Sequence, residues 1–127
     1  MAQLKKILLV DDDDMVLDAN LRILEKLNYQ VDAYRSSTEA LKAAQSEPHK
    51  WDLLFTDLSM PEMDGARLAS QIRQFRADIP VILYTGYLDA VDSIDIENLR
   101  ILGKPSPLDE IAQAVDQALK QEAPVAS

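Results

Sequence analysis

Apolar residues along this 127-residue chain alternate between two spacings, and this alternation limits the fold more than any other feature of the sequence. Five short runs rich in Val, Ile, Leu and aromatic residues have the length of buried β-strands. They are residues 4–10, 30–34, 51–56, 81–85 and 99–102. Between most of them, apolar residues recur at helical spacing. Strands that alternate with helices predict a mostly parallel sheet with right-handed crossovers and helices on both faces.

Four helices are expected around these strands. The first begins after Asp13 or Asp14, and the second begins after Ser36 or Ser37 and ends before Pro48. The third covers about residues 66–75, and the fourth extends from about Pro107 to Glu122. An Asp side chain is a good N-terminal cap, and a proline cannot continue a helix. Residues 86–98 have too few apolar positions for a clear prediction, so we expect a short helix or a mobile loop there.

The composition is that of a single folded domain. An apolar share of 47% and a charged share of 28% are ordinary for globular proteins, and the length suffices for one core. We expect one domain over residues 1–122 and a flexible tail over residues 123–127. The formal charge of -9 disfavours direct binding of nucleic acid, and the absence of cysteine excludes disulfides.

The N-terminus does not have the pattern of an export signal. Its apolar run of four residues is short and is followed by four consecutive Asp residues. We therefore expect a cytoplasmic protein that has no contact with the membrane.

Charged and polar side chains stand at the ends of the predicted strands. Asp11 and Asp12 follow the first strand, Asp57 follows the third, Thr85 ends the fourth, and Lys104 lies just after the fifth. Ligands of parallel α/β sheets bind beyond the carboxyl ends of the strands. If the first and third strands are neighbours, three carboxylates converge on one pocket and face a hydroxyl and an ammonium.

Such a group of carboxylates requires a cation. Two carboxylates about 4 Å apart repel by roughly 4 kcal/mol at an effective dielectric constant of about 20. Oxygen ligands at a solvent-open site suit Mg²⁺ with several retained waters better than Zn²⁺ or a fully enclosed Ca²⁺. Mg²⁺ accompanies phosphate chemistry, in which a carboxylate can act as nucleophile and become an aspartyl phosphate. The position of Asp57 at a strand end favours it as that nucleophile.

The motifs LLVDDDD, TDLSMPEMDG, YTG and GKPSP together resemble the receiver domains of two-component response regulators, over nearly the whole chain. The resemblance implies a flavodoxin-like (βα)5 three-layer sandwich with a five-stranded parallel sheet of order 2-1-3-4-5. It also implies the site residues: the phosphoacceptor Asp57, a Mg²⁺ (or Mn²⁺) site of Asp11, Asp12, Asp57 and the Ser59 carbonyl, phosphoryl binding by Thr85, Gly86 and Lys104, and a cis peptide bond before Pro105.

The resemblance implies partners as well as residues. A sensor histidine kinase or phosphotransfer protein would supply the phosphoryl group, and phosphorylation would switch binding of a downstream protein or formation of a homodimer. Such a protein is a signalling phosphoacceptor and not a turnover enzyme. Ile101 stands where receivers usually carry an aromatic switch residue, and Ser106 stands where a bulky apolar residue is common. With the TGY sequence at 85–87, these features are similar to receivers attached to hybrid sensor kinases.

Two other functions fit parts of the pattern. A haloacid-dehalogenase-like phosphatase also uses a strand-terminal aspartate with Mg²⁺, but it needs a second acid at the position that Ser59 occupies here. A pseudo-receiver would bind partners without phosphorylation, and Ile101 keeps that alternative open although the acidic pair, Asp57 and Lys104 are all present. Taken singly, each motif also has a plain explanation as a helix cap or a turn. Their joint spacing favours the phosphoacceptor.

Overall fold

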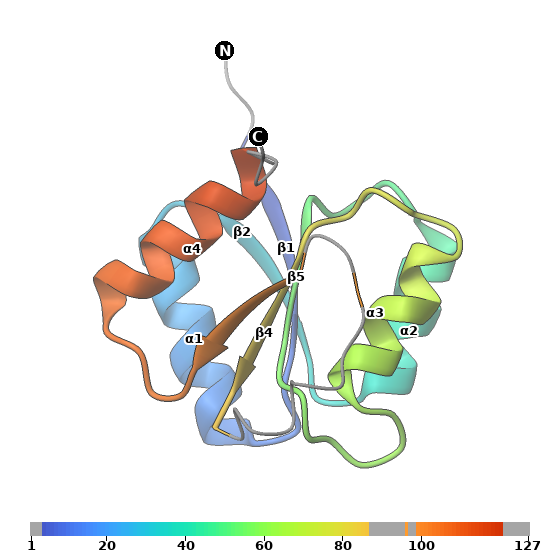
Figure 1. The fold of residues 1–127 in the computed structure, drawn as a ribbon, viewed down its shortest axis with the longest axis horizontal. Coiled ribbons are helices and arrows are strands. Elements are labelled where there is room, and N and C mark those ends of the chain that lie inside the picture. The colour runs from blue at the N-terminus through green and yellow to red at the C-terminus, as the bar shows by residue number, and fades with distance from the viewer. Residues whose placement is uncertain (1–3, 87–95, 97–98, 121–127) are drawn as a thin grey trace.

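A parallel sheet of order β2-β1-β3-β4-β5 runs through the middle of the computed structural model, which describes residues 4–86, 96 and 99–120 (Figure 1). Its strands are β1 (Lys6–Val10), β2 (Gln30–Tyr34), β3 (Leu53–Thr56), β4 (Val81–Thr85) and β5 (Leu99–Gly103). Within the described residues the helices are α1 (Asp14–Lys26), α2 (Ser37–Ser46), α3 (Gly65–Arg73) and α4 (Leu108–Lys120). The predicted α/β fold class and strand order are confirmed.

The sheet separates two apolar cores, so the molecule has three layers. Helices α1 and α4 cover one face, and α2 and α3 cover the other (Figure 1). Alternate residues of β1 enter opposite cores: Ile7 and Leu9 face α1 and α4, whereas Leu8 and Val10 face α2 and α3. Strands β3 and β4 are buried along their whole length. Burial on both faces explains why these strands are continuous apolar runs in the sequence.

Polar side chains fix where the helices begin. Asp13 caps α1 by accepting hydrogen bonds from the N–H groups of Met15 and Val16, at 2.9 and 3.3 Å. Ser36 caps α2 and Asp64 caps α3 in the same way, through single bonds of 3.2 and 2.8 Å. The sequence predicted Asp13 or Asp14 at the first of these positions. Each cap satisfies a backbone donor that the helix itself cannot.

Parts of the chain for which predictions were made lie outside the described residues. These parts are most of the 86–98 segment, the last residues of the final helix and the tail at 123–127. Among the helices that the structure describes, none has the length and apolar character needed to cross a membrane.

Candidate functional site

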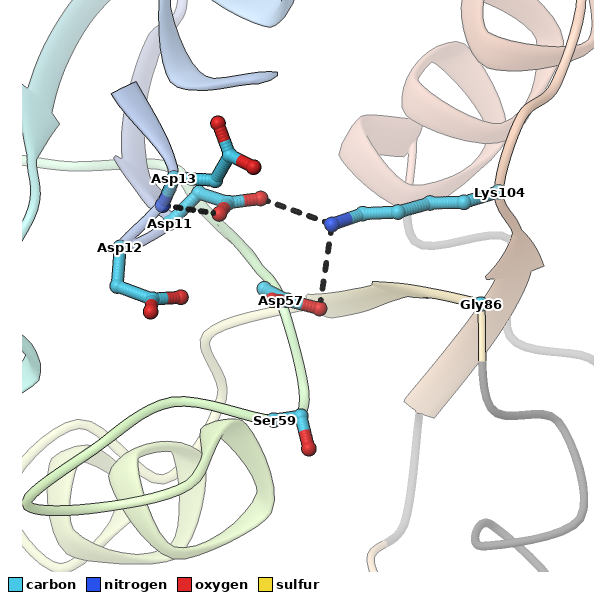
Figure 2. A pocket seen from close by; sticks show the side chains of 7 residues that line it. All are labelled: Asp11, Asp12, Asp13, Asp57, Ser59, Gly86 and Lys104. Carbon is cyan, nitrogen blue, oxygen red and sulfur yellow. Dashed lines mark hydrogen bonds and ion pairs between the residues drawn. The ribbon is translucent and has the colours of Figure 1, made fainter. Parts of the chain in front are cut away.

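The carboxyl ends of β1, β3 and β5 bring charged side chains together at one edge of the sheet (Figure 2). The pairing of Val10 with Thr56 places Asp11 beside Asp57, since each Asp follows directly after its strand. An open pocket of about 510 Å³ lies there. It is lined by Asp11, Asp12, Asp13, Asp57, Ser59, Gly86 and Lys104.

Three carboxylates meet in this pocket. Asp11, Asp12 and Asp57 each place one carboxylate oxygen within 4.8 Å of the others. The side chains of Asp11 and Asp57 are largely buried, with exposed fractions of 2% and 11%, and Asp12 is exposed. Asp11 accepts the N–H of Asp13 at 2.9 Å, and Asp57 accepts the N–H of Leu58 at 2.9 Å. These bonds orient two of the three carboxylates.

A single ammonium faces the three carboxylates. Lys104 Nζ lies 3.0 Å from Asp11 Oδ2 and 3.3 Å from Asp57 Oδ1 (Figure 2). The lysine side chain is largely buried, with 21% exposed, so these contacts are only weakly screened by solvent. With Asp13, four carboxylates line the pocket against one ammonium, so the pocket is anionic, and every candidate ligand is an oxygen. The donor set therefore suits a hard divalent cation such as Mg²⁺.

The shared environment shifts the titration of Asp57 and Lys104. Burial raises the pKa of Asp57, the charge of Asp11 raises it further, and Lys104 only partly opposes the shift. Burial lowers the pKa of Lys104, but the hydrogen bonds and charges of Asp11 and Asp57 outweigh burial and leave that pKa raised. Lys104 thus remains an ammonium near neutral pH, whereas the carboxylate of Asp57 is held at a cost to folding.

The raised pKa of Asp57 predicts that the charged carboxylate lowers the free energy of unfolding of the metal-free protein, by an amount that depends on pH. The folded state binds this proton more tightly than the unfolded chain, so the cost is complete above the folded pKa and is lost as the pH falls toward the ordinary value of 3.8. In chelating buffer at about pH 7, Asp57→Asn should increase the free energy of unfolding, measured by urea denaturation.

The gain from Asp57→Asn should shrink as the pH approaches 3.8, because the wild-type carboxyl then becomes neutral as well. Asp18→Asn is a suitable control, since Asp18 is exposed and forms an ion pair with Arg22 on the surface of α1. A loss of stability in Asp57→Asn at neutral pH would contradict the prediction.

The structure brings together most of the site residues that the sequence predicted. Asp11, Asp12, Asp57, Ser59, Gly86 and Lys104 all line the pocket. Thr85 differs, because its side chain is fully buried at the end of β4 and does not line the pocket. Ile101 lies on β5 with 41% of its surface exposed. The Lys104–Pro105 peptide bond is cis.

Two residues near the site were not singled out from the sequence. Gly65, the first residue of α3, donates its N–H to the carbonyl of Leu58 at 2.8 Å. A Cβ atom at Gly65 would lie only 2.1 Å from the backbone oxygen of Asp57. Tyr84, one residue before the end of β4, lies beside Lys104. The glycine at a helix start was a usable signal, but no local pattern reveals which side chain Tyr84 contacts.

Comparison with known proteins identifies the family. The family model described as the response regulator receiver domain matches residues 7–116. The chain belongs to this family. This receiver is therefore a signalling module of two-component systems rather than a turnover enzyme, as the sequence predicted. Its group of three acids is typical of the Mg²⁺-binding sites of receivers.

The relatives of this receiver differ in length. It is 31% identical over 119 residues to the response regulator receiver protein CpdR of Brucella abortus (strain 2308), a match that covers 91% of this chain and 98% of CpdR. It is 37% identical over 121 residues to the transcriptional regulatory protein GlrR of Escherichia coli (strain K12), covering 93% of this chain. The receiver spans only 27% of GlrR, and 13% of the Brucella abortus sensor kinase CckA.

Solved receiver structures have the same fold. The response regulator receiver protein from Sinorhizobium medicae WSM419 is 25% identical with a TM-score of 0.86, and the match covers 93% of this chain and 96% of that one. The receiver domain of the hybrid histidine kinase CckA is 31% identical with a TM-score of 0.77, covering 90% and 98%. The Thermotoga maritima protein TrrA, solved in complex with Mg(2+)-BeF, is 28% identical with a TM-score of 0.79, covering 91% and 99%.

Proposed function

We propose that this receiver accepts a phosphoryl group on Asp57 from a sensor histidine kinase or phosphotransfer protein, with Mg²⁺ (or Mn²⁺) bound, and thereby changes its binding to a downstream protein. One observation carries the proposal. The carboxylate of Asp57 lies in an open pocket, with the acids Asp11 and Asp12 within 4.8 Å and the ammonium of Lys104 at 3.3 Å. A nucleophile, a cation site and a fixed positive charge are the parts that phosphoryl transfer requires.

The transfer forms one bond and breaks one. A carboxylate oxygen of Asp57 bonds to phosphorus as the phosphorus–nitrogen bond of the donor phosphohistidine breaks, and the imidazole nitrogen keeps the electron pair. The product is an acyl phosphate. Lys104 is positioned to stabilise the charge on the phosphoryl oxygens, because its ammonium already lies 3.3 Å from Asp57 Oδ1. When its ammonium moves to contact the phosphoryl oxygens, Lys104 would give up part of its ion pair with Asp11.

The carboxylates of Asp11, Asp12 and Asp57 and the backbone carbonyl of Ser59 would hold the metal ion. Bound there, the ion would neutralise charge on the transferring phosphoryl group. The three carboxylate oxygens within 4.8 Å of one another fit this role, and the Ser59 side chain points away from them (Figure 2). Asp12 is the most accessible of the three acids, so it can exchange its water for the ion most readily.

Binding of the phosphoryl oxygens by Thr85 and Gly86 would couple phosphorylation to the end of β4. The amide of Gly86 belongs to a residue that lines the pocket, whereas the hydroxyl of Thr85 is fully buried. Use of that hydroxyl would require a shift of β4 toward the pocket. Ile101, on the neighbouring strand β5, would be the switch residue that responds to this shift. Such a shift would favour one of two pre-existing conformations. A cytoplasmic location follows from this proposal, because histidine kinases use ATP as their phosphoryl source.

The metal dependence of phosphorylation provides the direct test. The wild-type protein is incubated with acetyl phosphate in the presence of Mg²⁺ or of a chelator, and the intact mass is measured. We expect one added phosphoryl group with Mg²⁺ and none with the chelator. Reduction with borohydride followed by peptide mapping should locate it at residue 57. Labelling without metal or at another residue would contradict the proposal, and no labelling at all would favour a pseudo-receiver.

A further inference from the structure

Tyr84 is a buried aromatic residue that contacts three parts of the molecule around the pocket. Its exposed fraction is 6%. Its ring meets Phe55 of β3 edge to face, with ring centroids 5.5 Å apart and an angle of 62° between the planes. Lys104 Nζ lies 5.7 Å from the centroid of the Tyr84 ring. The Tyr84 hydroxyl accepts the N–H of Ser106 at 3.1 Å.

The ring of Tyr84 restricts where the ammonium of Lys104 can lie. A lysine side chain has four flexible carbons, and it must lose that freedom to hold its ammonium between Asp11 and Asp57. A cation within about 6 Å of an aromatic ring is attracted by about 0.5 to 2 kcal/mol, and the larger values belong to desolvated pairs. The pair here is largely withdrawn from water, and the contact with Phe55 holds the ring in place. The ring therefore favours the position of the ammonium seen in the pocket.

The hydroxyl of Tyr84 restrains the backbone that carries Lys104. The N–H of Ser106 donates to this hydroxyl, and the Ser106 hydroxyl donates to the carbonyl of Gly103. Lys104 and Pro105 therefore lie between two anchored residues, one at the end of β5 and one before α4. Ser106 departs from the bulky apolar residue that is common in receivers, and its small polar side chain makes the bond to Gly103 possible.

The geometry points to Tyr84 as a positioning residue for Lys104. Tyr84 acts on phosphoryl transfer only through that lysine. The ring side of Tyr84 orients the ammonium, and the hydroxyl side restrains the segment from Lys104 to Ser106. The kinetic consequence rests on the proposed function of Asp57, whereas the placement of Lys104 by the ring does not.

Kinetics with acetyl phosphate and Mg²⁺ test the consequence for the reaction. Tyr84→Leu should lower the maximal rate of Asp57 phosphorylation by about 5-fold and change the half-saturating concentration less, because the lysine acts on charge that develops during transfer. Tyr84→Phe keeps the ring and loses only the bond from the Ser106 N–H, so it should lower the rate by about 2-fold, clearly less than Tyr84→Leu. Tyr29→Leu is the control for lost aromatic packing, since Tyr29 packs against the same core, whereas the partners of the Lys104 ammonium within the described part of the chain are Asp11, Asp57 and Tyr84. A wild-type maximal rate in folded Tyr84→Leu, or an equal loss in Tyr84→Phe, would overturn the inference.

The NMR signals of the Lys104 ε-methylene group test the placement without any phosphorylation. The ring current of Tyr84 should displace these signals in the wild type and in Tyr84→Phe, and the displacement should disappear in Tyr84→Leu but not in Tyr29→Leu. If the wild type is not phosphorylated while this signature is lost in Tyr84→Leu, the proposed function fails and the placement of Lys104 stands. Unchanged Lys104 signals in Tyr84→Leu would overturn the placement itself.

Discussion

Replacing Asp57 with Asn should abolish the Mg²⁺-dependent phosphorylation of this receiver. An amide has no anionic oxygen to attack phosphorus, and it also removes one of the three ligands proposed for the metal ion. The nearest alternative acid, Asp11, has one oxygen bonded to the N–H of Asp13 and the other to Lys104, so it is poorly placed to replace Asp57. We expect no labelling by intact-mass measurement under conditions that modify the wild type fully.

The matched control for Asp57→Asn is Asp13→Asn. Asp13 lines the same pocket but does not belong to the group of three acids, and its main contacts are the bonds that cap α1. Asn caps helices as well as Asp does, so the variant should fold and should be phosphorylated at close to the wild-type rate. Labelling of Asp57→Asn at the wild-type rate would refute Asp57 as the acceptor.

The second large effect is expected at Gly65, where a single added methyl group should destabilise the fold. The Cβ atom of Gly65→Ala would lie 2.1 Å from the backbone oxygen of Asp57 and 3.0 Å from its backbone carbon. Both are backbone atoms, so no side-chain rotation can relieve the clash, and the start of α3 must move away from β3. We expect a loss of about 3 kcal/mol in the free energy of unfolding, measured by urea denaturation.

Gly86→Ala separates this close contact from a general effect of losing a glycine at the pocket. A Cβ atom at Gly86 would lie 4.0 Å from Lys104 Cβ, the nearest atom of the described residues apart from its chain neighbours, which is an ordinary contact. The change also keeps the amide that is proposed to bind a phosphoryl oxygen. Gly86→Ala should alter stability by less than about 0.5 kcal/mol and leave phosphorylation intact. Equal stabilities of Gly65→Ala and the wild type would show that α3 can move at little cost.

Moving the start of α3 should also disturb the acceptor. The carbonyl of Leu58, next to Asp57, accepts the N–H of Gly65, so these backbone segments are held together. The close approach of α3 thus sets where the Asp57 backbone lies and, through it, where the carboxylate points. Wherever Gly65→Ala remains folded, we expect slower phosphorylation than in Gly86→Ala.

Local patterns in the sequence were enough to predict the elements and the acids at their ends. Apolar residues mark strands such as β3 by a continuous run and helices such as α4 by their spacing, because β3 is buried on both faces and α4 on one. A cap at Asp13 or Asp14 was predictable because it depends on the residues that follow directly, and the structure places it at Asp13. The pocket residues Asp11, Asp57 and Lys104 were predictable for a related reason, since each stands at the end of a strand.

Contacts between distant elements could not be predicted in this way. The burial of Thr85, the approach of Gly65 to Asp57 and the ring of Tyr84 beside Lys104 all depend on how β4, α3 and β5 pack against one another. The sequence thus determined the kind of fold and the chemical groups offered at its edge, because those follow from spacing along the chain. Only the tertiary structure decided which groups touch, because register and packing between strands set distances that no local pattern contains.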